Sequence, residues 1–158
     1  MLRASPVGWF SWNFVLSDDG QRLAEINLAW LREAGQLSVG EDSYRVYREG
    51  VMSGSFVLEK DGVRLASAEK PSALYRSFNI AFGGKVYTLE AESAFRRKFV
   101  LKNGTERVGS IYPEGAFTRK CIVDLPEQFP VPVSAFTLWL VIILWKRESD
   151  ASAAAAAG

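Results

Sequence analysis

The residues with the clearest potential for chemistry in this 158-residue chain are basic. Arg96, Arg97 and Lys98 are adjacent, and Lys102 follows four residues after Lys98. Strand alternation predicts that Arg96, Lys98 and Lys102 share one face, opposite the apolar residues of the same segment. Cations near an anionic membrane bind phosphate-bearing lipids with about 1 kcal/mol for each Lys or Arg. The alternative is a solvated outer face that prevents edge-to-edge pairing of sheets.

A second basic pair, Arg119 and Lys120, is expected to lie near this run. The candidate anion-binding or lipid-binding residues are Arg96, Lys98, Lys102, Arg119 and Lys120. Trp9 and Trp30 are candidate contacts for a partner, because an exposed aromatic ring can form the centre of a binding surface. The sequence leaves open whether either ring is exposed.

Residues that usually catalyse reactions or bind metals are scarce. The chain has no His, and so lacks the usual general base at neutral pH and the commonest metal ligand. Three carboxylate pairs, Asp18-Asp19, Glu41-Asp42 and Glu90 with Glu92, are explained more simply as turns and exposed strand positions than as two-acid hydrolytic sites. Cys121 is the lone cysteine, expected in the core. The sequence therefore predicts no catalytic residue, no metal and no cofactor.

The overall charge and the cysteine content restrict the partners and the compartment. Nineteen Lys and Arg residues nearly balance 18 Asp and Glu residues, so no global field attracts nucleic acid, and no nucleic-acid partner is expected. A single cysteine suits a reducing compartment. No apolar stretch typical of a secretory signal follows the first residues. We therefore expect a cytoplasmic protein that is at most peripheral at the membrane.

The tripeptide Phe-Val-Leu occurs three times, as Phe14-Val15-Leu16, Phe56-Val57-Leu58 and Phe99-Val100-Leu101. Each copy is followed by an Asp-Gly or Asn-Gly pair, which supplies the positive φ that a tight hairpin turn requires. An Arg then lies 8 residues after each Phe, at Arg22, Arg64 and Arg107. The pattern predicts three equivalent hairpins. Their Arg residues either ring a ligand or face solvent and pair with Glu.

The C-terminal segment predicts a buried helix. Pro130 and Pro132 end the sheet, and Ser134 is expected to cap a helix at about 133–147. Between Ala135 and Trp145 every residue except Thr137 is strongly apolar, so the helix is buried in protein or in a bilayer. Fifteen residues give roughly 22 Å, short of the ~30 Å hydrocarbon core, which favours protein. The Ala-rich tail, 148–158, is expected to be disordered.

Together these patterns predict a mainly β fold, with residues 8–147 forming a single domain. It is a closed antiparallel barrel of about 12 strands, built from three repeated units and enclosing one hydrophobic C-terminal helix. A barrel of that size is too wide for its own side chains to fill, so the helix would plug it.

This arrangement resembles the tubby C-terminal domain, which phospholipid scramblases and plant LURP-one-related proteins share in outline. The resemblance rests on the three hairpins, on the terminal apolar helix, and on Phe117-Thr118-Arg119-Lys120 leading to Val123-Asp124-Leu125-Pro126. It implies a non-enzymatic module that docks at membrane phosphoinositides or at another protein. The chain lacks both the cysteine-rich segment of scramblases and an acidic cluster like their proposed calcium site, so lipid scrambling is not implied.

The favoured function is therefore a non-catalytic binding or scaffolding module whose partner is an anionic phospholipid headgroup or a protein. Two alternatives stay open. The terminal helix could insert in a bilayer and anchor the protein by its tail. Catalysis would have to rest on carboxylates, Lys or Tyr in a cleft.

Overall fold

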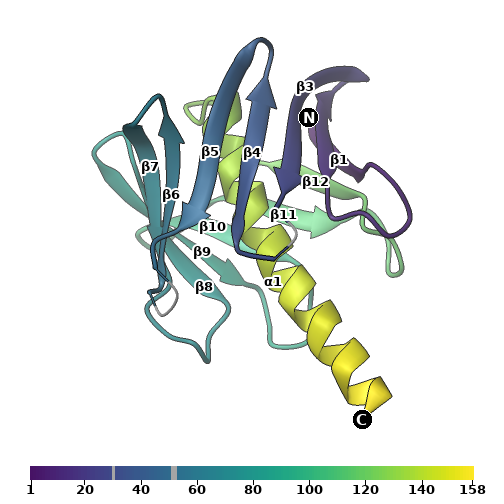
Figure 1. Ribbon diagram of the computed structural model, residues 1–158. Helices are drawn as coiled ribbons and strands as arrows, with labels where there is room; N and C mark the ends of the chain where they lie inside the picture. The colour runs from purple at the N-terminus through teal and green to yellow at the C-terminus, as the bar shows by residue number, and fades with distance from the viewer. Residues whose placement is uncertain (30, 51–52) are drawn as a thin grey trace.

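Twelve antiparallel strands close into a barrel around one helix in a computed structural model, which describes residues 1–29, 31–50 and 53–158 (Figure 1). The strands are β1 (Leu2–Pro6), β2 (Phe14–Asp18), β3 (Gln21–Leu28), β4 (Ala34–Val39), β5 (Asp42–Arg48), β6 (Ser55–Lys60), β7 (Val63–Glu69), β8 (Ser77–Phe82), β9 (Lys85–Ala91), β10 (Phe99–Asn103), β11 (Glu106–Pro113) and β12 (Cys121–Asp124). Each strand pairs with its neighbours along the chain. The expected closed antiparallel barrel is confirmed.

Strand β1 closes the barrel between β2 and β12. Its Ala4 is fully buried and lies between Leu16 and Cys121 in the two ladders. The barrel therefore begins at Leu2, and the expected boundary at residue 8 is too late. Leu2–Pro6 contains too few β-branched or aromatic residues to indicate a strand, and its place depends on two distant partners.

The three Phe-Val-Leu copies form the first strands of the hairpins β2–β3, β6–β7 and β10–β11. In each hairpin the register shifts directly after the Leu, and this Leu faces Ala24, Ala66 or Gly109 on the second strand. Such a bulge increases the local twist of a strand pair, which a closed barrel needs. The wider division into three repeated units goes beyond these hairpins and stays a prediction.

The three equivalent Arg residues lie in exposed ion pairs. Arg22 pairs with Glu25 and Arg64 with Glu49, while Arg107 lies 3.6 Å from Glu92. Each guanidinium is about half exposed on the outside of the barrel. This arrangement agrees with outward-facing charges that pair with Glu, and not with a ring around a ligand.

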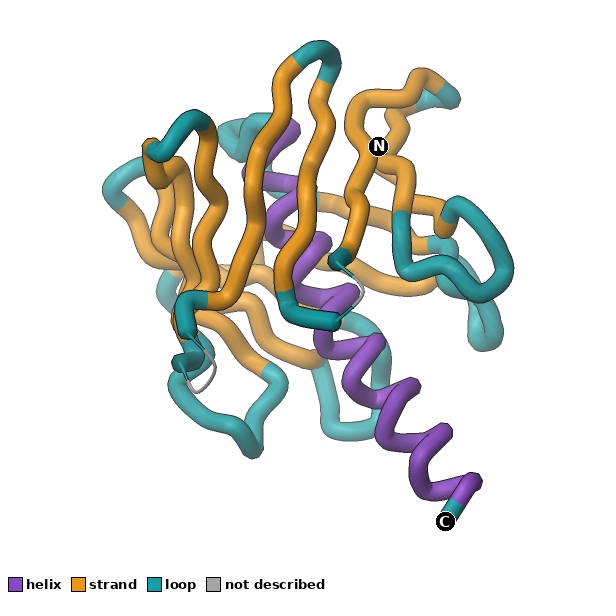
Figure 2. The backbone as a smooth tube through the Cα atoms, viewed as in Figure 1, coloured by secondary structure: helices purple, strands orange, loops and turns teal. Residues whose placement is uncertain are grey.

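Helix α1 (Val131–Ala157) runs through the barrel, and its residues Val133 to Trp145 are all buried (Figure 2). Trp139, at the centre, stacks on Phe136 and meets the ring of Phe56 edge-on. Because every residue of this segment is buried, no face of it meets solvent, which explains why the sequence shows no polar side. The expected enclosure of the apolar helix is confirmed.

Both ends of α1 differ from the expected ones. The helix begins at Val131, with Pro130 as the N-cap and no side-chain cap, so Ser134 is inside the helix and does not cap it. Pro132 fits the first turn because its missing N–H would have no helical partner there. Where the sequence predicts a disordered tail, the helix continues to Ala157 and projects from the barrel (Figure 1). Ala-rich residues extend a buried helix readily, because the nucleus already exists.

Candidate functional site

The candidate site is the end of the barrel where α1 leaves it, here named the exit face. Because the strands alternate in direction, the connections after β1, β3, β5, β7, β9 and β11 all lie at this end. They are loops of five to seven residues, at 7–13, 29–33, 49–54, 70–76, 92–98 and 114–120. The five hairpin turns at the opposite end have two residues each. Long loops therefore surround the emerging helix (Figure 2).

Among the described residues, large apolar side chains stand exposed on five exit loops. Trp9 is 91% exposed and Phe95 99%, so these rings lie almost entirely in solvent. The set comprises Val7, Trp9, Phe10, Leu31, Leu74, Tyr75, Phe95 and Phe117. Apolar residues gathered on one end of a molecule mark an interaction surface, whereas single scattered ones do not.

The charges of the barrel are divided between its two ends. The six exit loops contain eight Lys and Arg residues and four Glu residues. The six connections at the opposite end contain four carboxylates, Asp19, Glu41, Asp61 and Glu127, and no Lys or Arg. Although the chain is nearly neutral, the exit face is therefore positive and the opposite end negative.

Ion pairing leaves the exit face with free positive charge. Each Glu of the exit loops, namely Glu33, Glu49, Glu92 and Glu114, lies within 4.0 Å of at least one Arg. In the described part of the chain, Arg32, Lys70, Arg97, Arg119 and Lys120 have no carboxylate within that distance. A negatively charged surface could meet these cations without displacing a carboxylate.

The candidate residues near Arg96 are divided between a loop and a strand. Arg96 and Lys98 lie in loop 92–98, where strand alternation does not apply, and both approach Glu92, at 3.8 and 3.3 Å. Lys102 lies in β10 and pairs with Glu90 of β9. The structure thus places Arg96 and Lys98 on the exit face, and Lys102 on the barrel wall.

Arg119 holds the β1–β2 loop in place. Its guanidinium donates hydrogen bonds to the carbonyl oxygens of Gly8, Trp9 and Ser11, and lies over the ring of Trp12 at 5.3 Å. Lys120 is exposed beside it. Of the two candidate Trp contacts, Trp9 is exposed on the exit face, and Trp30 lies outside the described residues.

Arg97 brings two exit loops together. Its Nη1 donates to the carbonyl oxygen of Thr118 at 2.9 Å, which joins loop 92–98 to loop 114–120. Trp145 of α1 donates from Nε1 to the carbonyl oxygen of Arg97 at 3.2 Å. Arg97 was not among the candidates that the sequence indicated, because strand alternation placed it on the apolar face.

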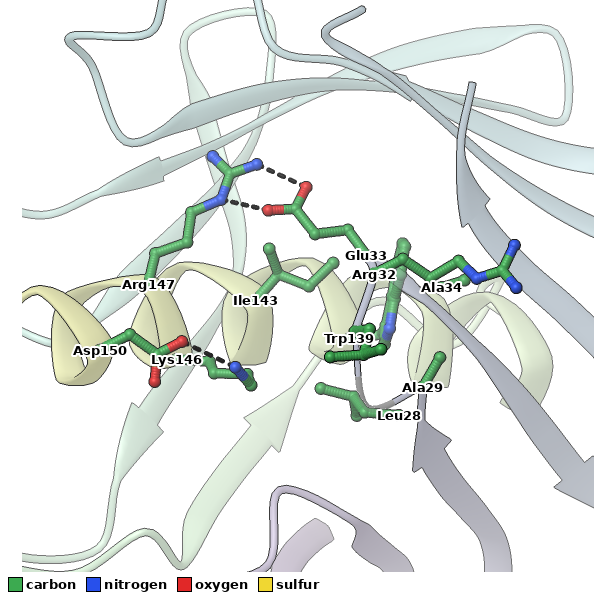
Figure 3. Close-up of a pocket in the computed structure, with 11 residues that line it drawn as sticks. Leu28, Ala29, Arg32, Glu33, Ala34, Trp139, Ile143, Lys146, Arg147 and Asp150 are labelled. Carbon is green, nitrogen blue, oxygen red and sulfur yellow. Dashed lines mark hydrogen bonds and ion pairs between the residues drawn. The ribbon is translucent and has the colours of Figure 1, made fainter. Parts of the chain in front are cut away.

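A cavity of about 270 Å³ separates α1 from the β3–β4 loop (Figure 3). Arg147 and Glu33 span it with two hydrogen bonds of 2.5 and 2.6 Å, and Lys146 pairs with Asp150 at 2.7 Å. The buried Nε1 of Trp139, in the wall, has no hydrogen-bond partner among the described residues. The Arg147–Glu33 pair joins the helix to the loop across this cavity, and Arg32, unpaired among the described residues, adds a cation to its lining.

No family model, curated protein or solved structure matches this chain. The likeness to the tubby C-terminal domain therefore stays a prediction. Within the described ranges, no helix is both long and apolar enough to cross a bilayer. In the same residues, no three His, Cys, Asp or Glu side chains gather where they could hold a metal ion.

The sequence does contain a signal for the exit face. In four of its loops a large apolar residue is followed within two positions by Arg, as Leu31-Arg32, Tyr75-Arg76, Phe95-Arg96 and Phe117-Thr118-Arg119. The same pairing occurs within strands, as Leu2-Arg3, Tyr44-Arg45 and Tyr47-Arg48. Among the connections, however, it occurs in the longer ones and not in the tight glycine turns with which they alternate. Long and short connections alternate along the chain, and antiparallel strands place alternate connections at the same end of the barrel. The length of the connections therefore predicts that these four loops lie together.

Cys121 is expected to be unreactive in the folded protein. Its side chain is fully buried, and burial raises the pKa of the thiol from about 9.0 to about 12. At pH 8 Ellman's reagent should label it only after denaturation, since the thiolate is the reactive form. Between pH 9.0 and about 12 the unfolded chain releases this proton before the folded one, so the free energy of unfolding should fall with pH there. Rapid labelling without denaturant would contradict the burial.

Proposed function

We propose that this protein is a non-catalytic binding module that docks on an anionic phospholipid bilayer through its exit face. The observation that carries the proposal is the shared location of exposed apolar loop tips and unpaired cations around the emerging helix. An anionic surface attracts the cations, and the apolar tips can then leave water.

The physical properties of a bilayer surface match this arrangement. Lys and Arg contribute about 1 kcal/mol each near anionic lipids, and Trp and Tyr rings favour the headgroup level. Interfacial segments bury apolar side chains roughly 5–10 Å into the boundary between headgroups and acyl chains. The tips stand on separate loops with cations between them, whereas the centre of a protein interface is depleted of charge.

The projecting end of α1 is compatible with this docking. Residues 151–157 of the helix carry no charged side chain. The last seven helical residues are about 10 Å long, close to the depth that interfacial segments reach. Lys146 and Asp150 pair with each other at the base of this projection. The helix end could therefore enter the headgroup region without burying an unpaired side-chain charge.

Anchoring by the apolar helix itself has less support. The segment that would have to insert, Phe136 to Trp145, is buried inside the barrel. Its insertion in a bilayer would expose the apolar inner surface of the sheet to water, with a free-energy cost of about 25 cal/mol for each Å² of apolar area.

Vesicle sedimentation tests the proposal. The fraction of protein that pellets should rise with the phosphatidylserine content, stay near background with pure phosphatidylcholine, and fall several-fold between roughly 0.05 and 0.5 M salt as the charges are screened. The control is the same protein spun without vesicles. If the protein stays in the supernatant with phosphatidylserine vesicles at low salt, the proposal is wrong, and the exit face has to be assigned to a protein partner.

A further inference from the structure

A second hollow, of about 420 Å³, lies on the exit face beside the emerging helix. Its wall contains the aromatic rings of Trp9, Phe10, Trp12 and Trp145, with the guanidinium groups of Arg97 and Arg119 between them. The exposed side of α1 completes the wall with Glu148, Ser149 and Ser152. Three loops and the helix therefore meet around two cations.

Arg97 is a partly buried cation with free donors. Its guanidinium lies 4.8 Å from the centre of the Trp145 ring and uses Nη1 for the bond to Thr118. A guanidinium has five N–H donors, and no carboxylate among the described residues lies within 4.0 Å of this one. Burial lowers the pKa of Arg97, Cys121 and Glu148 partly offset this effect, and the nearby Arg119 lowers the pKa further. The positive charge of Arg97 is therefore partly desolvated and has no carboxylate in direct contact.

Glu148, the only carboxylate among the described residues of the wall, is already engaged in an ion pair. Glu148 lies 2.6 Å from Arg76, which also donates to the carbonyl oxygens of Ser93 and Arg96. Arg119 is fixed by its bonds to the β1–β2 loop and by its position over Trp12. The two guanidinium groups are thus held in place before any ligand arrives, which reduces the entropy lost on binding.

We propose that this hollow binds the phosphate of a phosphomonoester lipid headgroup, an inference that rests on the proposed docking of the exit face on a bilayer. The planar fork of Arg matches phosphate oxygens and forms charge-assisted hydrogen bonds with them. A terminal phosphate has three free oxygens and up to two negative charges, which suits two cations better than a phosphodiester does. The hollow opens where the docked lipid headgroups would lie.

The decisive comparison is Arg97→Gln against Arg96→Gln. Both variants remove one positive charge from loop 92–98, but Arg96 is 74% exposed and does not line the hollow. On vesicles of phosphatidic acid and phosphatidylserine matched in surface charge, the wild type and Arg96→Gln should prefer phosphatidic acid. Arg97→Gln should lose this preference and bind phosphatidic acid at least about fivefold more weakly, because hydrogen bonds to charged groups are lost. Equal effects of the two substitutions would overturn the phosphate site and leave the docking proposal intact.

Because Arg97 also bonds to Thr118, Arg97→Gln could lose binding through a folding defect. A second pair of variants tests the hollow without changing Arg97. Ser149→Glu adds a negative charge at the hollow from an exposed helix position, whereas Val86→Glu adds it at an exposed position on β9, at the opposite end of the barrel and outside the hollow. Both should melt like the wild type, and only Ser149→Glu should abolish the preference for phosphatidic acid. An unchanged preference in Ser149→Glu would contradict the assignment.

Soluble ligands separate a lipid phosphate from free phosphate. Three Trp residues line the hollow, so their fluorescence should respond saturably to monomeric dihexanoyl phosphatidic acid and to glycerol 3-phosphate, and the response should vanish in Arg97→Gln. Equal affinity for inorganic phosphate and for dihexanoyl phosphatidic acid would overturn the lipid assignment. Absence of any response would overturn the site, whatever the outcome of vesicle sedimentation.

Discussion

Leu140→Asp is expected to prevent folding. Leu140 lies in the middle of α1, is fully buried, and is surrounded by the inner faces of the barrel strands. The substitution removes apolar contacts and buries a carboxylate with no cation nearby, and breaking a buried charge pair alone costs about 3–5 kcal/mol. Because the whole stability of a domain is about 5–15 kcal/mol, the variant should be insoluble or lack near-ultraviolet circular dichroism.

The matched control for this experiment is Leu140→Met. It keeps the volume and polarity of the side chain and should lower the free energy of unfolding by less than about 1.5 kcal/mol, measured by urea denaturation. A Leu140→Asp protein that is soluble and unfolds cooperatively near the wild-type midpoint would contradict the burial of α1 in the barrel.

The parts of the fold that the sequence predicts correctly are those with a local signal. Asp19-Gly20 and Asp61-Gly62 adopt the positive φ angles that their hairpin turns require. The stretch from Ala135 to Trp145 has no polar face, and the structure buries all of it inside the barrel (Figure 1). In both cases the residues themselves specify the local structure, whatever their distant partners are.

The parts that it predicts wrongly depend on distant partners. Strand β1 exists because β2 and β12 both pair with it, and its own residues show little strand pattern. The helix continues past residue 148 because the buried turns before it supply the nucleus. Neither cause lies in the residues of the segment itself.

The candidate site shows the same division. The sequence shows that Lys102 and Glu90 are charged, but only the pairing of β9 with β10 shows that they neutralise each other. In contrast, Phe95 and Phe117 become one surface only when the antiparallel order places loops 92–98 and 114–120 at the same end. On the exit face, the sequence indicates Trp9 and four of the basic residues, but it does not indicate Arg97 or the other exposed apolar side chains.

The double variant Phe95→Glu with Phe117→Glu is expected to abolish binding to phosphatidylserine vesicles. Both rings lie almost entirely in solvent, so the substitutions remove no buried contact and should leave the melting temperature unchanged. Each substitution removes a ring whose transfer out of water contributes about 1.5–3 kcal/mol to the free energy of binding. It also adds a negative charge, whose repulsion by the anionic lipid weakens binding by about 1 kcal/mol. Together they should lower the partition coefficient by more than about 100-fold, measured by vesicle sedimentation.

The matched control is Val63→Glu with Val86→Glu, which changes the net charge equally. These side chains are each 60% exposed and lie on β7 and β9, next to the tight turns at the opposite end of the barrel. If the exit face docks on the bilayer, the control should bind nearly as well as the wild type, because its new charges lie a barrel length from the lipid. Equal losses in the two double variants would mean that only the net charge governs binding, and the exit face would then have no special role.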